Sequence, residues 1–227
     1  MWSKIKDFHK KYCHAWVLLY FFVYLAWFFW LEGYVTPDSD YIRMYVPLDD
    51  MIPFCEWFMI PYLLWFPYMG LVVTFSVFDG RSNFFKGAAY LFIGMSLCLL
   101  ICTIWPNGQD LRIEEFSRDN IMTRMIATLY STDTNTNVFP SIHTYNSVVA
   151  FVMVCHSNKL KGNIPVKVIS FILSLSIILS TVFLKQHSVL DVIGGIGLAA
   201  ILYVIIYKIN WGYLFNRGIK KSQEEMA

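Results

Sequence analysis

Two histidines and one aspartate stand where polar stretches of the chain meet long apolar runs. His143 follows Pro140 and Ser141 at the start of one run, and His187 and Asp191 open another. A carboxylate inside an apolar segment of membrane length is energetically costly, so its presence indicates function. His187 and Asp191 are four residues apart and share one face of a helix. An aspartate that accepts a hydrogen bond from one imidazole nitrogen leaves the other nitrogen free for nucleophilic attack.

The residues before His143 suit a phosphoryl group. A helix N-terminus presents free N–H groups and a partial positive charge, which favour an anion and above all a phosphate. Pro140 fits a first helical turn because its missing N–H is not required there. Ser141 adds a hydroxyl donor, and His143 adds a group that titrates near neutrality. The stretch 138–143 therefore predicts a phosphate site at the start of a helix.

These residue types suggest distinct roles in phosphoryl transfer. His187 would be the nucleophile, and Asp191 would fix its tautomer and stabilise the cation formed on attack. His143 would protonate the leaving oxygen as a general acid. Arg112 and Lys185 are cations that we expect at the same membrane face. They could hold the non-bridging oxygens of the phosphoryl group.

Each of these residues also has a plain structural interpretation. Ser141 could be a helix cap, Arg112 a solvated loop charge and Lys185 a side chain that reaches to the membrane interface. The two histidines with Asp191 could instead ligate a metal, as in non-haem iron sites. A metal needs all three side chains to converge on one point, whereas an oriented nucleophile needs only the i, i+4 pair. We therefore expect no metal and no cofactor.

The composition is that of a membrane protein. Of the 227 residues, 57% are hydrophobic and only 15% are charged, whereas a soluble domain carries about 25% charged residues. The net charge of +2 is too small to indicate a nucleic-acid partner. The five cysteines show neither a disulfide framework nor a metal-binding spacing. We expect the bilayer and a lipid phosphate substrate to be the partners, and no nucleic acid.

Six apolar runs predict an all-α fold, a single integral membrane bundle of six transmembrane helices. Each run is long enough to cross the hydrocarbon core. The expected spans are about 15–31, 57–78, 87–105, 138–155, 164–184 and 187–207. The long polar segment 106–137 has room for one or two short helices. Because structured loops of this length are more often functional than simple connectors, we expect it to be the catalytic loop.

Charge asymmetry sets the expected orientation. Most of the 18 lysines and arginines fall in the N-terminus, the turn at 79–86, the region 156–167 and the tail. By the positive-inside rule, both termini are then cytoplasmic. His143, His187 and the loop 106–137 would all lie at the outer face. We expect a multi-pass protein of a bacterial cell membrane with its active site on the outside.

Two stretches resemble motifs of the type 2 phosphatidic acid phosphatase (PAP2) superfamily. Residues 139–143 are similar to its Pro-Ser-x-His motif, and His187-x-x-x-Asp191 resembles the end of its third motif. The resemblance covers the six-span layout and roughly residues 106–195. It implies a phosphohistidine on His187 oriented by Asp191, with His143 as the acid and then as the base for water. It also implies that no metal is required.

The chain departs from the family motifs where they hold phosphate. Arg112 looks like the arginine of the first motif, but Trp105 stands where that motif has a lysine. In the third motif Ser180 matches the serine, but Thr181 stands where an arginine is expected. Lys185, one turn later, is the candidate substitute for that arginine.

The sequence therefore predicts a metal-independent membrane phosphatase that hydrolyses a lipid phosphomonoester or diphosphate at the outer face. Because two of the motif cations that would hold the phosphate are missing, an alternative is a lipid phosphotransferase of the sphingomyelin or inositol phosphorylceramide synthase type. Those enzymes also resemble this superfamily and pass the head group to an alcohol. A proton-coupled transporter is a second alternative, although its titratable residues should face each other near mid-membrane. The identity of the lipid and the oligomeric state are left open.

Overall fold

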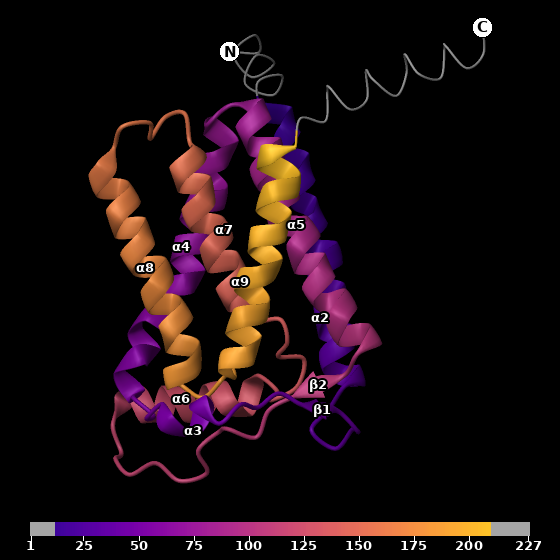
Figure 1. The fold of residues 1–227 in the computed structure, drawn as a ribbon, viewed down its shortest axis with the longest axis vertical. Helices are drawn as coiled ribbons and strands as arrows, with labels where there is room; N and C mark the ends of the chain where they lie inside the picture. The colour runs from indigo at the N-terminus through magenta and orange to yellow at the C-terminus, as the bar shows by residue number, and fades with distance from the viewer. Residues whose placement is uncertain (1–11, 210–227) are drawn as a thin grey trace, which may run out of the picture.

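The computed structural model describes residues 12–209 of the protein. The described chain is predominantly helical, and its long helices run along one axis (Figure 1). These helices are η1 with α2 (Cys13–Leu19 and Tyr20–Tyr34), α4 (Met59–Phe78), α5 (Arg81–Ile104), α7 (Ile142–His156), α8 (Ile164–Phe183), and α9 with η3 (Val189–Tyr203 and Val204–Lys208). The prediction of an all-α membrane fold is confirmed at this level.

Within the described residues, five helical segments are long and apolar enough to span a membrane. They are Cys13–Tyr34, Glu56–Phe78, Arg81–Ile104, Ile164–Phe183 and Val189–Lys208. The remaining expected span, 138–155, is α7, which has only 15 residues. The count of six spans is therefore not confirmed. α7 is short because residues 138–141 precede the helix, and they form part of the candidate site described below.

The turn expected at 79–86 is much tighter than predicted, because α5 already begins at Arg81. Only Asp79 and Gly80 separate α4 from α5. Gly80 has a φ of 98°, a conformation that side chains disfavour and glycine adopts freely.

α7 lies at the centre of the bundle and contacts α4, α5, α8 and α9. Its Tyr145, Val149 and Ala150 are fully buried. The surrounding helices leave large apolar side chains such as Phe22 and Ile169 exposed. An apolar surface of this kind suits contact with lipid rather than water. The central position of α7 matters because this helix carries His143.

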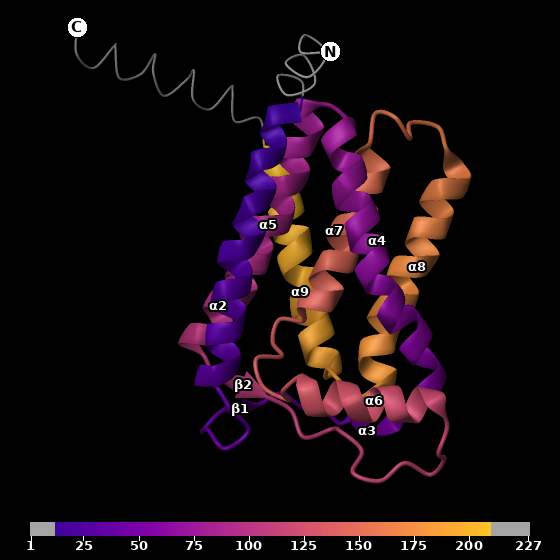
Figure 2. The ribbon, with the colours of Figure 1, turned by 180° about the vertical axis from the view of Figure 1, so that it is seen from behind.

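Short elements cross one end of the bundle, which we call the loop end (Figures 1 and 2). They are α3 (Leu48–Met51), η2 (Glu56–Phe58), α6 (Ile121–Thr132), β1 (Ile42–Arg43) and β2 (Asn107–Gly108). β1 pairs in parallel with β2, with Ile42 opposite Asn107. The start of η1 and the end of η3 lie at the opposite end of the bundle. The polar loops 35–55 and 105–141 are thus joined over the N-termini of α7 and α9.

Two glycines allow α9 to approach the segment before α7. A Cβ at Gly194 would lie 2.4 Å from the ring of Phe139, and a Cβ at Gly195 would lie 2.8 Å from the carbonyl oxygen of Ser141. The two helices therefore pack closely at these two positions. A Cβ at Gly197 would meet nothing within 4 Å, so this third glycine of α9 makes no such contact.

Candidate active site

His187 and Asp191 form a pair at the start of α9. The His187 Nδ1 lies 3.3 Å from the Asp191 Oδ2, and both side chains are almost completely buried. The same Oδ2 accepts a hydrogen bond from the backbone N–H of Ser188 at 2.9 Å. Ser188 in turn caps α9 by accepting from the N–H of Leu190 at 3.1 Å. Asp191 therefore fixes both the imidazole and the first turn of its own helix, which leaves the His187 Nε2 as the nitrogen facing away from the carboxylate.

His143 stands across from this pair in the first turn of α7. Its ring centroid lies 5.9 Å from that of His187. The rings of Tyr62 and Trp65 on α4 pack against it at centroid distances of 5.0 and 4.7 Å. Aromatic packing on these sides holds the imidazole, which stays partly exposed. Two histidines that are far apart in the sequence thus meet at the loop end.

The backbone joins the two helices that carry the histidines. Ser141 is the N-cap of α7, and its Oγ accepts from the N–H of Thr144 at 3.3 Å. The N–H of Ser141 donates to the carbonyl oxygen of Asp191 at 3.1 Å. Pro140 was expected in the first helical turn, but it precedes the cap because α7 begins at Ile142. Ser141 is fully buried and acts as a cap, so its contact with a phosphate stays a prediction.

Arg112 holds loop backbone together. Its guanidinium donates to the carbonyl oxygens of Tyr130, Asp133 and Thr134 at 3.0, 2.7 and 2.7 Å. It also donates to the Gln186 Oε1 at 2.8 Å, directly beside His187 in the sequence. Arg112 is therefore close to His187, but four of its hydrogen bonds are made within the protein. Its role as a phosphate ligand stays a prediction.

Lys185 is directed toward the neighbouring loop. Its Nζ donates to the carbonyl oxygens of Asp49 and Ile52 at 2.7 and 2.6 Å. Burial lowers the pKa of the Lys185 ammonium, and the charges of Asp49 and Asp50 partly offset this effect. The structure thus places this side chain on the end of α3, whereas the sequence suggests a phosphate ligand.

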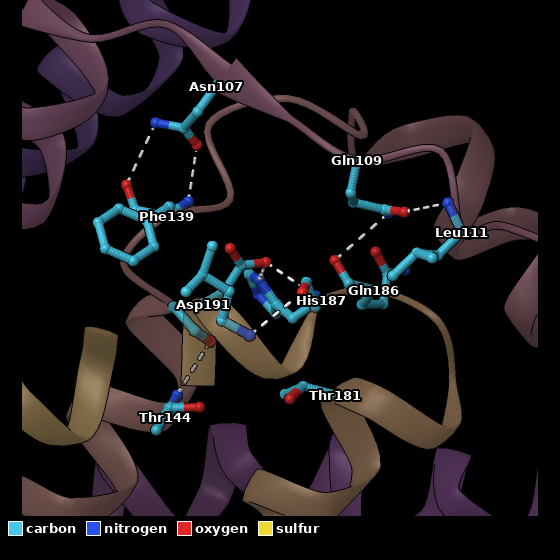
Figure 3. A network of polar contacts seen from close by, with 12 residues as sticks. Asn107, Gln109, Leu111, Phe139, Thr144, Thr181, Gln186, His187 and Asp191 are labelled. Carbon is cyan, nitrogen blue, oxygen red and sulfur yellow. Dashed lines mark hydrogen bonds and ion pairs between the residues drawn. The ribbon is translucent and has the colours of Figure 1, made fainter. Parts of the chain in front are cut away.

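The loop 106–137, which the sequence predicts to be catalytic, is tied to the segments that carry both histidines (Figure 3). The Asn107 Oδ1 accepts from the N–H of Phe139 at 2.7 Å. The Gln109 Nε2 donates to the carbonyl oxygens of Lys185 and Gln186 at 3.1 and 3.4 Å. Asn107 and Gln109 are both fully buried. The loop after α5 therefore positions the approach to α7 and the turn before α9 together.

Asp133, in the loop 106–137, is close enough to Arg112 and His187 for their charges to act on its pKa. Burial and the charge of Glu32 raise the pKa of Asp133, while Arg112 and His187 partly oppose the shift. Glu32 accepts hydrogen bonds from the Thr134 Oγ1 at 2.6 Å and from the Asn137 Nδ2 at 3.0 Å. This region thus contains acidic as well as basic groups.

Residues 116–214 match the PAP2 superfamily. The matched stretch contains His143, His187 and Asp191, and the predicted resemblance is confirmed. PAP2 proteins are generally phosphatases or related phosphotransferases. No curated protein and no solved structure matches the chain.

The two positions that depart from the PAP2 motifs have structural roles here. Thr181 is fully buried, its Oγ1 bonds back to the carbonyl oxygen of Ile178, and its own carbonyl accepts from the N–H groups of Gln186 and His187. Trp105 is the C-cap that follows α5 and is half exposed at 49%. Neither residue supplies a cation, so the PAP2 phosphate clamp is incomplete at these positions.

Sequence reasoning missed several residues around the histidines. In the sequence, nothing distinguishes Tyr62 and Trp65 from the other aromatic residues of an apolar span. The Trp65 Nε1 and the Gln186 Nε2 are buried donors without a hydrogen-bond partner among the described residues. Only the position of Gln186 next to His187 offered a signal in the sequence. Between residues 12 and 209, no group of three or more His, Cys, Asp or Glu side chains is arranged to hold a metal.

Proposed function

We propose that the protein is a membrane enzyme that transfers a phosphoryl group from a lipid phosphomonoester or diphosphate to water through a phosphohistidine. The contact of the His187 Nδ1 with Asp191, opposite the ring of His143, is the observation that carries this proposal. It supplies an oriented nucleophile and a second titratable group for the leaving oxygen. The PAP2 match supports chemistry on phosphate esters.

The proposed reaction has two displacements at phosphorus. The His187 Nε2 attacks, the ester P–O bond breaks, and protonated His143 gives its proton to the leaving oxygen. Asp191 stabilises the positive charge that forms on the His187 ring. Neutral His143 then accepts a proton from water as its oxygen attacks phosphorus, and the P–N bond breaks to release phosphate. Both histidines return to their starting protonation states.

The membrane setting favours a lipid substrate. His143 and His187 lie at the loop end, where apolar helices meet the polar segments of α3 and α6. A lipid phosphate would place its head group at this level and its chains along the apolar helix surfaces. By the positive-inside argument this end is the outer face, with both termini in the cytoplasm. Both histidines are at helix starts, whereas the titratable residues of a proton-coupled transporter should face each other near mid-membrane.

Neutral donors are proposed to complete the phosphate site. The Gln186 amide and the Trp65 indole each have a buried N–H without a partner in the described part of the chain. Trp65 packs on His143, and Gln186 precedes His187. Phosphate oxygens would satisfy such donors, which costs less than leaving them unpaired. They would compensate in part for the motif cations missing at Trp105 and Thr181.

A phosphotransferase is the second candidate. The acceptor oxygen must lose its proton to His143, and the aromatic rings of Tyr62 and Trp65 pack against that histidine. Such apolar surroundings suit an alcohol acceptor with a hydrophobic body better than water. The incomplete PAP2 clamp points in the same direction.

One assay separates the two candidates. Purified protein in detergent with excess EDTA is given labelled phosphatidic acid, a labelled isoprenyl diphosphate, a labelled sphingoid phosphate or head-group-labelled phosphatidylcholine, each with and without a ceramide acceptor. Release of inorganic phosphate supports the phosphatase, and label in a new lipid supports the transferase. Full turnover by a His187→Ala variant would refute the mechanism for both.

A further inference from the structure

Asp49 is a buried carboxylate that neither the motifs nor the proposed chemistry accounts for. It lies in the short helix α3 within the loop that follows α2, and its side chain is 2% exposed. Its neighbour Asp50 on the same helix is exposed. A buried carboxylate is costly unless hydrogen bonds satisfy it. The partners of Asp49 therefore indicate what it does.

Those partners lie at the start of α9. The Asp49 Oδ2 accepts from the Ser188 Oγ at 2.6 Å, and its Oδ1 accepts from the N–H of Val189 at 2.8 Å. The Oδ2 also accepts from the N–H of Val46 at 2.9 Å, which fixes the carboxylate within its own loop. A carboxylate only accepts, so the buried Ser188 hydroxyl must be the donor. Asp49 thus satisfies donors of the first turn of α9 from a segment 139 residues away.

A second contact joins the same two segments on the other side of His187. Lys185 donates to the carbonyl oxygens of Asp49 and Ile52. His187 therefore lies between two residues, Lys185 and Ser188, that are both fastened to α3.

The contact at Ser188 reaches the nucleophile in one step. The backbone N–H of Ser188 donates to the same Asp191 Oδ2 that lies against the His187 Nδ1. A shift of Ser188 therefore changes the position of the carboxylate that orients the imidazole. It also changes the distance between the rings of His187 and His143, because Tyr62 and Trp65 on α4 pack against the His143 ring.

We propose that Asp49 is a positioning residue for phosphoryl transfer, which fixes the first turn of α9 and so aims His187 at the phosphorus. This inference rests on the proposed function and deepens it. If Asp49 has this role, the loop between α2 and α4 belongs to the active site, because it fixes the first turn of α9. Asp49 acts through Ser188 and Asp191 and is not required to touch the substrate.

Two substitutions at Asp49 and one matched control test the proposal. Asp49→Ala removes all three acceptor contacts. Asp49→Asn keeps the size of the side chain but replaces one carboxylate oxygen by an NH2 group. That group then faces hydrogen-bond donors, which are the Ser188 hydroxyl and the N–H groups of Val46 and Val189. Asp50→Asn removes a carboxylate from the same helix whose side-chain hydrogen bond is to exposed Tyr45. Folded protein is quantified for each variant by gel filtration and thermal unfolding in detergent.

The expected result is a loss in kcat per folded protein with little change in KM. Misplacement of a reacting group by about 1 Å can cost about 100-fold in rate, and we expect a loss of that order for Asp49→Ala. Asp50→Asn should match the wild type within about twofold, in line with other surface changes away from special contacts. The double variant Asp49→Ala, Asp191→Asn should lose little more kcat than Asp191→Asn alone, since both changes act on the orientation of the His187 ring.

A purely structural role gives a different pattern. If kcat per folded protein of Asp49→Ala stays within twofold of the wild type, or if its loss multiplies with that of Asp191→Asn, the positioning role is wrong. If His187→Ala retains turnover, the proposed function itself fails, whatever Asp49 does. If Asp49→Ala does not fold, Asp49→Asn and Ser188→Ala take its place in the same cycle.

Discussion

The backbone N–H of Ser141 donates to the carbonyl oxygen of Asp191 at 3.1 Å, which joins the first turns of α7 and α9. The two turns carry His143 and His187, so this one bond couples the positions of both rings. It is possible only because α9 approaches the segment before α7 at Gly194 and Gly195. The relative position of the two histidines and the packing of α7 against α9 therefore depend on the same contact.

Replacing Asp191 by asparagine should separate orientation from folding. The amide keeps the size of the side chain, but it cannot stabilise the cation on His187. We expect kcat to fall by about 10²–10⁴-fold, a range guided by the same change in a serine protease triad. Phosphate release under saturating substrate measures the loss. A variant with unchanged kcat would show that His187 does not need its carboxylate.

A methyl group at Gly195 should push α9 away from α7. The added Cβ of Gly195→Ala would lie 2.8 Å from the Ser141 carbonyl oxygen, a backbone atom that moves only with its helix. Overpacking of this kind costs about 1–3 kcal/mol, and turnover should fall as the histidines separate. Gly197→Ala is the matched control, because its Cβ meets nothing within 4 Å. Equal unfolding midpoints and rates for the two variants would contradict the packing argument.

Arg112→Lys should weaken the packing of the loop 106–137. One ammonium cannot replace a guanidinium that reaches three carbonyl oxygens and the Gln186 amide oxygen. We expect a loss of about 1–3 kcal/mol from acceptors left unpaired, together with reduced activity. Arg118→Lys is the control, since that exposed side chain makes a single 3.5 Å contact with Glu56. Thermal unfolding in detergent measures both variants, and equal losses would indicate that the Arg112 network is unimportant.

The stability of the turn between α4 and α5 should depend on pH through Asp79. Its oxygens accept hydrogen bonds from Asn83, Ser157, Asn158 and Lys159. Burial alone would raise the pKa of Asp79, but these bonds outweigh it and lower the pKa from its ordinary 3.8. The unfolded chain therefore takes up this proton at a higher pH than the folded chain. The stabilisation is complete above about pH 3.8 and is lost as pH falls through the lowered pKa.

Asp79→Asn gives the corresponding measurement. The variant should unfold at a lower temperature than the wild type near neutral pH, because a charged acceptor has been removed at a cost of about 1.5–3 kcal/mol. The difference in unfolding temperature between the wild type and the variant should stay constant down to about pH 5 and then narrow below pH 3.8. A difference that stays constant across the whole pH range would mean that the four donors do not stabilise the ionised carboxylate.

The sequence predicts the placement of His187 beside Asp191 better than it predicts the start of the helix that holds His143. The pair at 187 and 191 is readable because spacing alone places both side chains on one helix face. The start of α7 was misplaced, since the apolar run beginning at Val138 does not reveal that residues 138–141 precede the helix. Hydrophobicity marks a segment as buried but does not say where its helix begins.

Tertiary contacts explain the remaining differences. Nothing local distinguishes Asp49 from Asp50, and only folding places the first against Ser188. The contacts of Lys185 could not be predicted for the same reason, because its carbonyl partners lie more than 130 residues away in the sequence. Hydrogen bonds to distant backbone atoms leave no pattern in a single sequence, so positioning residues of this kind escape motif reasoning.

Trapping of the covalent intermediate tests the central claim most directly. The enzyme is mixed with a ³²P-labelled lipid phosphate, quenched rapidly in alkali, digested and mapped by mass spectrometry. A phosphohistidine stable to alkali and labile to acid is expected on His187, with more of it in His143→Ala if hydrolysis is slowed more than formation. Label on His143 or on a serine, or turnover without any phosphohistidine, would contradict the assignment of His187 as the nucleophile.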